Sequence, residues 1–445
     1  MLSRRRLLGL GLGALGAAAL AGCAAPGPPL VNTEPIIPAA APGEKVRLTY
    51  WAWLNDLQNV CDIWNAKHPN IQVEAVFGLP GSDGGYEKMY SALDTGGGPD
   101  IGQIELRSVP EFMLVNGLVD LARYGAKDYA HLYNPAVWNQ VSFNGGIYAI
   151  PQDSGPEGFF YQPAALAKVG ASVPKTWAQW AEIAQEIRKE NKANYLESVS
   201  VSDPSWFIAL AEQAGARWFR TDPDGWIITM DDEPTLDVAR FFDRAIDGDL
   251  VSTAFDPYSA GWTAAAAQGQ IAAVTSASWG DALIETIGNG AGKWRVAPMQ
   301  RWPTGFGSSA LGGSTAAVLA NSRHPKEAME FAIWMTTSKE GIDAMIKYCG
   351  VGWSPAKDYI GAQREAPSTF FSGQNYNTEV FLPASRQQNP NWVWWPIVQR
   401  TIFTIADGFQ RKLTSGQSLV DTMHQAQQTT VETFRHIGLT VQDSS

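Results

Sequence analysis

VRLTYWAWLNDLQNVCDIWNAKHPNIQVEAVF, residues 46–77, is the stretch that decides the fold class. Residues 46–53 are β-branched or aromatic in alternation, which predicts a strand. Residues 56–68 predict a helix, because their apolar side chains recur at helical spacing: Leu57, Val60, Cys61 and Trp64. Residues 71–77 predict a second strand. Further strands and helices alternate up to about residue 117, so we expect an α/β protein with a parallel sheet.

Length and composition bound the rest of the chain. Its 445 residues are too many for one small core, so two domains or lobes are expected. The formal net charge is −11, and no long basic run follows the first few residues, which disfavours nucleic-acid binding. Tryptophan is abundant, with 18 copies against 5 histidines. This balance favours a protein that binds neutral ligand rings by aromatic stacking, rather than a metal-dependent or acid–base enzyme.

The first 23 residues, MLSRRRLLGLGLGALGAAALAGC, are typical of an export signal. Three arginines precede an apolar stretch that is too short and too rich in glycine for a membrane-spanning helix. LAGC, residues 20–23, resembles a bacterial lipobox, which implies removal of a signal peptide (residues 1–22) and lipidation of Cys23. Residues 3–8 partly resemble a twin-arginine signal, so the export route stays open.

Residues 23–44 are rich in proline and alanine, and we expect them to be a lipidated tether. Cys61 and Cys349 then remain as thiols outside the cytoplasm, and the sequence leaves open whether they pair. A phosphate-binding P-loop, a G-x-S-x-G nucleophile elbow, H-E-x-x-H and C-x-x-C are all absent from the sequence. We therefore expect neither a metal ion nor a cofactor, and no enzymatic activity.

A series of motifs resembles one family along residues 46–440. It begins with the strand–helix–strand opening and continues with NGGIYAIPQD (144–153), AAAAQGQIAAVTSASWGD (264–281) and LGGSTAAVLANSRHPKEAMEF (311–331). Their order is similar to that in the extracellular solute-binding proteins of ABC transporters, in the carbohydrate-binding family that includes the maltose-binding protein. The resemblance implies the two-lobed type II fold of periplasmic binding proteins, with a hinge and a central ligand cleft.

The resemblance also implies how the chain divides. Residues 45–152 and 308–350 would form the N-terminal lobe, and residues 153–307 and 351–445 the C-terminal lobe. The lobe crossovers are expected near 151–156, 305–311 and 350–353. Ligand would then stabilise a closed form by touching both lobes.

Ligand sites in such folds lie at the carboxyl ends of strands and between domains. The residues expected at the site on this basis are Trp53, Asn55, Glu105, Gln152, Asp153, Trp279, Gly280, Asp281, Gly312, Gly313 and Ser314. Trp206, which follows the helix start DPS, is expected there too. Trp392 is expected because NPNWVWWP (389–396) resembles the segment with which the maltose-binding relatives place a ring against sugar. Trp279 lies among small residues in VTSASWGDA (274–282). Its ring could pack in the core or could stack against a ligand, and the resemblance favours contact with the ligand. Trp392 and Trp394 lie one residue apart, so one of them could face the cleft, and Trp392 is preferred slightly.

The expected function is that of a lipid-anchored receptor on the outer face of the cytoplasmic membrane. It would act as a monomer, capture a mono- or oligosaccharide or an amino sugar, and deliver it to the permease subunits of an ABC importer. Indole covers the apolar face of a sugar ring, while polar side chains bind its hydroxyls. One alternative ligand is a phosphorylated polyol such as a glycerophosphodiester, which Arg107 or Arg386 would favour if either faced the cleft. A secreted carbohydrate-active enzyme with two cleft carboxylates is the other alternative.

Overall fold

The opening stretch forms a strand, a helix and a second strand, as predicted. In the computed structural model, which describes residues 35–222 and 224–442, these are β1 (Val46–Ala52), α1 (Leu57–Lys67) and β2 (Ile71–Phe77). β1 pairs in parallel with β2 and with β3 (Ile101–Glu105). The signal peptide, Cys23 and the first part of the tether lie outside the described residues.

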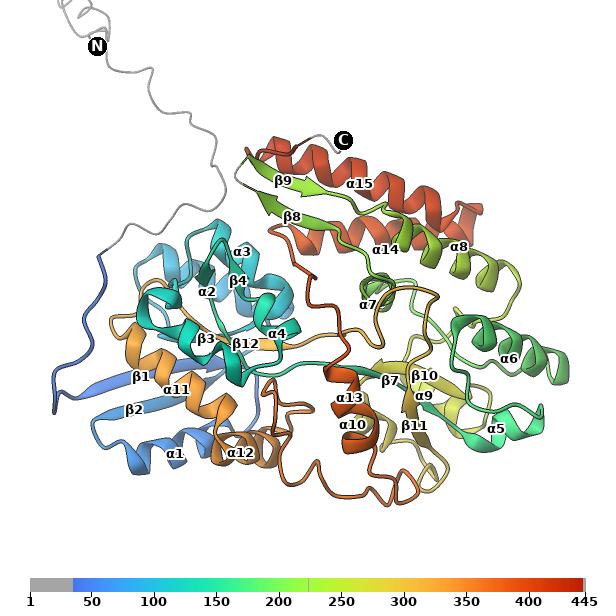
Figure 1. Ribbon diagram of the computed structural model, residues 1–445, viewed down its shortest axis with the longest axis horizontal. Coiled ribbons are helices and arrows are strands. Elements are labelled where there is room, and N and C mark those ends of the chain that lie inside the picture. Colours follow the sequence, from blue (N-terminus) through green and yellow to red (C-terminus); the bar gives the residue numbers. More distant parts are fainter. Residues whose placement is uncertain (1–34, 223, 443–445) are drawn as a thin grey trace, which may run out of the picture.

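The first lobe is built on a five-stranded sheet of order β2-β1-β3-β12-β6 (Figure 1). β12 (Ser314–Val318) comes from far along the chain and runs antiparallel to β3 and to β6 (Ile150–Pro151). The expectation of a purely parallel sheet is therefore wrong at this edge. The chain re-enters the lobe where β3 ends, with Ser314 opposite Glu105, so β12 must run in the reverse direction.

Helices cover both faces of this sheet and bury its apolar side chains in one core. Beside α1 they are α2 (Gly85–Asp94), α3 (Val109–Leu114), α4 (Pro135–Asn139), α11 (Pro325–Thr337) and α12 (Lys339–Cys349). A small hairpin of β4 (Ser142–Phe143) and β5 (Gly146–Ile147) lies beside them.

The second lobe contains a three-stranded antiparallel sheet of order β10-β7-β11. Its strands are β10 (Ala273–Ala277), β7 (Glu157–Tyr161) and β11 (Arg295–Pro298). The helices around it are α5 (Pro163–Lys168), α6 (Trp177–Glu190), α7 (Ser205–Ala214), α8 (Glu233–Asp247), α9 (Ala260–Ala267), α10 (Gly280–Ile284) and α13 (Leu382–Ser385). Thr176 caps α6, as predicted, by accepting a hydrogen bond from Gln179 N at 3.2 Å.

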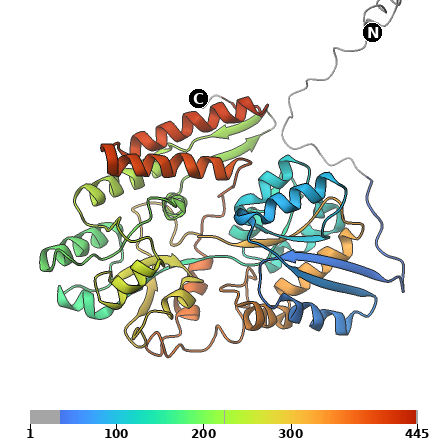
Figure 2. The same cartoon turned by 180° about the vertical axis from the view of Figure 1, so that it is seen from behind.

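The last part of the chain packs on one end of the second lobe. α14 (Val398–Ser415) and α15 (Leu419–His436) lie beside the hairpin of β8 (Phe219–Asp222) and β9 (Gly225–Ile228), as both ribbon views show (Figures 1 and 2). This hairpin is not among the strands predicted from the sequence. Trp226 in β9 pairs with Val441, which joins the end of the described chain to the lobe.

Three segments connect the two lobes and lie side by side. Leu311 N donates to Gly155 O at 2.9 Å, and Ser154 N donates to Trp353 O at 3.2 Å. A Cβ atom at Gly155 would lie 2.0 Å from Leu311 O, so the two crossovers can pair this closely only with glycine there. These contacts tie all three crossovers into one hinge region.

Cys61 is buried in α1, Cys349 is half-buried at the end of α12, and both are free thiols. In the part of the chain that the structure describes, no helix combines the length and the apolar character needed to cross a membrane.

Candidate functional site

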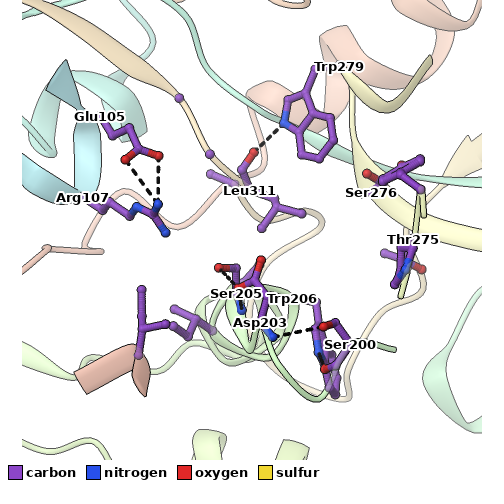
Figure 3. Close-up of a pocket in the computed structure, with 18 of the residues that line it drawn as sticks. Glu105, Arg107, Ser200, Asp203, Ser205, Trp206, Thr275, Ser276, Trp279 and Leu311 are labelled. Atoms are coloured by element: carbon purple, nitrogen blue, oxygen red, sulfur yellow. Dashed lines mark hydrogen bonds and ion pairs between the residues drawn. The ribbon is translucent and has the colours of Figure 1, made fainter. Parts of the chain in front are cut away.

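A cavity of about 470 Å³ lies between the two lobes. The first lobe contributes Glu105, the last residue of β3, and Arg107, which follows that strand, and the re-entering chain contributes Gly312 and Gly313. The second lobe supplies side chains from α7, from β10 and from residues 256–258. Its volume lies in the range of small-molecule sites, roughly 300–1,000 Å³. Figure 3 shows how these side chains converge from separate elements.

Trp279 forms one wall of this cavity, at the step from β10 to α10. Its Nε1 donates to Leu311 O at 2.9 Å, which fixes the indole against the second crossover. The small residues around it are needed for space, since a Cβ atom at Gly280 would lie 2.4 Å from the Tyr258 hydroxyl. Gly352, on the third crossover, packs directly on the Trp279 backbone. The ring is thus held in place while one side of it borders the cavity.

Two other half-buried indoles, Trp206 and Trp394, line the same cavity. Trp206 Nε1 donates to Ser200 O at 2.7 Å, and Trp394 Nε1 donates to Gln140 Oε1 at 2.7 Å. Because the protein satisfies all three indole N–H groups, the rings are fixed and offer their apolar faces. The Trp394 bond also joins the second lobe's chain to Gln140, which directly follows α4 of the first lobe.

Four charged side chains line the cavity. Arg107 is paired with Glu105 at 3.0 Å, so these two charges largely cancel. Asp203 accepts hydrogen bonds from Ser205 N at 3.0 Å and Ser205 Oγ at 2.6 Å, at the start of α7. Asp256 stands on the loop before α9. No group of three or more His, Cys, Asp or Glu side chains suited to a metal ion occurs within the two described ranges.

A hydrogen-bonded layer supports the cavity wall behind Gly313. Ser314 N and Oγ donate to the two oxygens of Asp153 at 2.6 and 2.8 Å. Gln103 and Gln152 donate to Ser314 Oγ at 3.2 and 3.1 Å. Burial raises the pKa of Asp153, and the Ser314 hydrogen bonds oppose this shift. The layer locks the first crossover to the start of β12.

Three glutamates of the second lobe are buried. Burial raises the pKa of Glu157 and of Glu197 to about 7, and that of Glu212 well above its usual value. Glu157 accepts a hydrogen bond from Ser309 on the second crossover. Glu197 accepts bonds from Trp180 Nε1 and from Thr275 N, next to the cavity. Glu157 therefore ties β7 to the second crossover, and Glu197 fixes β10 beside the cavity.

Residues 42–342 match the family model of the bacterial extracellular solute-binding proteins, which is about two thirds of the chain. The chain belongs to this family. Solute-binding proteins of known structure share its two-lobed fold, with a hinge and a central ligand cleft. The galacto-N-biose-/lacto-N-biose I-binding protein of the ABC transporter from Bifidobacterium longum superposes with a TM-score of 0.77 and 25% identity. That match covers 90% of this chain and 100% of the other.

Several curated relatives of this solute-binding protein are sugar-binding proteins. The arabinooligosaccharide-binding protein of Bacillus subtilis (strain 168) is 24% identical over 334 residues, which are 72% of this chain and 76% of that protein. The lactose-binding protein of Rhizobium radiobacter is 23% identical over 364 residues, which are 76% of this chain and 81% of that protein. The family and these relatives are binding proteins rather than enzymes.

The solute-binding fold brings several residues predicted from the sequence to one cavity. The predicted residues that line it are Glu105, Trp206, Trp279, Gly312 and Gly313. Gln152, Asp153 and Ser314 lie in the supporting layer behind its wall instead. Their contact with ligand stays a prediction.

Four predicted residues, besides Trp392, are not among the cavity lining. Trp53 packs by its ring against Tyr86, and Asn55 is exposed in the turn before α1. Gly280 is buried at the start of α10. Asp281 is 3% exposed and is bound by Arg364 and by the Tyr376 hydroxyl, so its carboxylate serves the core of the lobe. Proximity to a strand end placed these residues near the cleft without showing which way they face.

The preference for Trp392 over Trp394 is wrong. Trp392 is 1% exposed and packs against Trp218 and Trp395 in the second-lobe core, whereas Trp394 lines the cavity. The stretch NPNWVWWP contains three indoles, and their facing depends on packing partners far away in the sequence.

Asp203, Asp256 and Tyr258 also line the cavity, although they are not among the predicted site residues. Asp203 precedes Trp206 in SDPSW, and the helix start there was the available signal. Asp256 and Tyr258 lie in an irregular loop that gave no periodic pattern. Arg386, which was left unplaced, is exposed and lies outside the cavity lining, while Arg107 is inside it.

Proposed function

We propose that this chain captures a carbohydrate between its lobes and delivers it to the permease subunits of an ABC importer. The observation that carries the proposal is the cavity with three fixed indole rings and a rim of carboxylates, hydroxyls and one guanidinium. Rings of this kind cover the C–H face of a sugar, and the polar groups bind its hydroxyls. The sugars named for the relatives support the same class of ligand.

The lipidated Cys23 would hold the protein on the outer face of the cytoplasmic membrane, where it would act as a monomer without catalysing a reaction. The ranges 45–152 with 308–350, and 153–307 with 351–445, would move as the two lobes. Closure around the sugar would bring Glu105 and Arg107 of one lobe toward Asp203 and Trp279 of the other.

A phosphorylated polyol is disfavoured as the ligand, although Arg107 lines the cavity. Its guanidinium is already paired with Glu105, and the other charged lining residues, Asp203 and Asp256, would repel a phosphate.

The other alternative is a glycoside hydrolase, which would cleave the saccharide that it binds. Incubation with candidate oligosaccharides distinguishes this alternative, and we expect each oligosaccharide to be recovered intact.

The experiment that tests the proposed function is a thermal-shift screen of mono- and oligosaccharides, amino sugars and glycerophosphodiesters. A ligand that binds only the folded protein raises its melting temperature with concentration. We expect a shift with at least one saccharide and none with the phosphodiesters. A shift with phosphodiesters alone would overturn the proposal.

A further inference from the structure

The charges that line the cleft cavity are unbalanced. Three carboxylates, Glu105, Asp203 and Asp256, face it together with a single cation, Arg107. The Glu105–Arg107 pair, 3.0 Å apart, is neutral as a unit. The remaining two carboxylates leave the cavity with a net charge of about −2.

Asp203 and Asp256 are both exposed in this structure and lie without a cationic partner from the described residues. Asp203 is oriented by Ser205, whose N and Oγ both donate to Asp203 Oδ1. Among the residues that the structure describes, no lysine, arginine or histidine forms an ion pair with Asp203 or Asp256. Figure 3 shows Asp203 beside Ser205 and Trp206 at the start of α7, with Trp279 farther across the site and Leu311 between Asp203 and Trp279 in this view. The site thus holds a carboxylate next to one indole, that of Trp206.

Indole rings and carboxylates both bind ammonium ions in proteins. The face of a tryptophan attracts a cation within about 6 Å, and a carboxylate forms a charge-assisted hydrogen bond with it. Both interactions strengthen when closure of the lobes excludes water. The formal charge of −11 adds a field that attracts cations and repels anions over a longer range.

We propose that the saccharide held in this cavity carries a basic nitrogen, and that Asp203 and Asp256 select it by binding its ammonium group. This inference rests on the proposed carbohydrate function and narrows the ligand to cationic amino sugars. An N-acetylated or neutral sugar would leave both carboxylates with hydroxyl or amide donors alone. A uronic acid or sugar phosphate would be repelled.

Calorimetric titration of the full chain with three matched disaccharides tests the proposal: the β-1,4-linked glucosamine dimer, its N-acetylated form and cellobiose. We expect the glucosamine dimer to bind about tenfold more tightly than the others at low salt. This preference should shrink at high salt and at a pH where the amine is deprotonated.

The variant Asp203→Asn/Asp256→Asn removes both carboxylates, and it should reduce the ratio of amine to neutral affinity to near one. The control variant Asp358→Asn/Asp407→Asn changes the same net charge at two exposed sites outside the cavity lining, and it should keep the ratio.

If the unmodified chain binds cellobiose as tightly as the glucosamine dimer or more tightly, the proposed preference for a cationic sugar is overturned. The proposed carbohydrate function would still hold. A similar fall in the ratio of amine to neutral affinity in the control variant would also overturn the cationic preference. The overall charge of the protein, rather than the two cavity carboxylates, would then cause the preference. Failure of every saccharide, in this titration and in the wider screen, would overturn the carbohydrate function as well.

Discussion

The indole Nε1 of Trp279 donates a hydrogen bond to the carbonyl oxygen of Leu311 at 2.9 Å. Trp279 belongs to the second lobe, and Leu311 lies at the end of the second crossover. A ring positioned to contact the ligand is therefore fixed by the segment about which the lobes would bend. This link makes Trp279 a part of both the binding surface and the hinge.

Replacing Trp279 with alanine should weaken binding of a saccharide by about 1–3 kcal/mol, on the scale of lost ring contact and buried aromatic area. Titration calorimetry measures the change. Trp302→Ala, a half-buried indole of the same lobe outside this cavity, should bind as the unmodified chain does. Unchanged affinity in folded Trp279→Ala would remove this ring from the site.

Trp392 and Trp394 should differ in what their loss affects. Trp392→Ala empties a core position and should lower the free energy of unfolding by about 3–5 kcal/mol. Trp394→Ala should cost less stability, because the ring is half-buried, and should weaken ligand binding. Urea unfolding and titration of both variants check this, and equal losses of stability would contradict the assignment of the two rings.

Asp281→Asn should act on stability rather than on binding. The substitution leaves the guanidinium of Arg364, 15% exposed in its side chain, without its carboxylate, which costs about 3–5 kcal/mol for a buried pair. Asp281→Asn/Arg364→Met should recover part of that loss in the same urea experiment. A large loss of affinity in the folded single variant would instead return Asp281 to the ligand site.

The buried carboxyl of Glu157 should make stability depend on pH. Its pKa rises from the usual 4.5 to about 7 on folding because burial disfavours the charged form. Its contribution is therefore fully present below pH 4.5 and is lost as pH rises through 7, up to about 3 kcal/mol. Unfolding of Glu157→Gln between pH 5 and 8 should show a smaller decline than the unmodified chain.

Glu432→Gln, an exposed position on α15, serves as the control for this pH series and should follow the unmodified chain. Glu197 and Glu212 should keep part of the decline in Glu157→Gln, because burial raises the pKa of both. A Glu157→Gln curve parallel to that of the unmodified chain would show that Glu157 is ionised without penalty.

Local patterns predicted the opening strand–helix–strand unit and the Thr176 cap, because periodicity and capping depend on neighbours in the sequence. The antiparallel return of β12 depends on where the chain re-enters the lobe, which no local pattern records. The order of the motifs along the chain, through its resemblance to one family, predicted the two-lobed fold and the cleft.

Within the site, residues on regular elements or at their ends, such as Glu105, Trp206 and Trp279, could be predicted. The direction in which a side chain points at a strand end decided the rest. Asp281 turns to Arg364 and Trp392 to the core, since partners more than eighty residues away in the sequence, such as Arg364 for Asp281 and Trp218 for Trp392, bind or bury them. Asp256 could not be predicted, because only the geometry of its loop shows that it lines the cavity.

A crystal structure of the full chain with the saccharide that ranks first in the thermal-shift screen tests the central claim most directly. The sugar should occupy the cavity between the lobes, with a ring face against Trp279 or Trp206 and polar atoms within hydrogen-bond distance of Asp203. A saccharide bound elsewhere, or a closed cleft without sugar at saturating concentration, would contradict it.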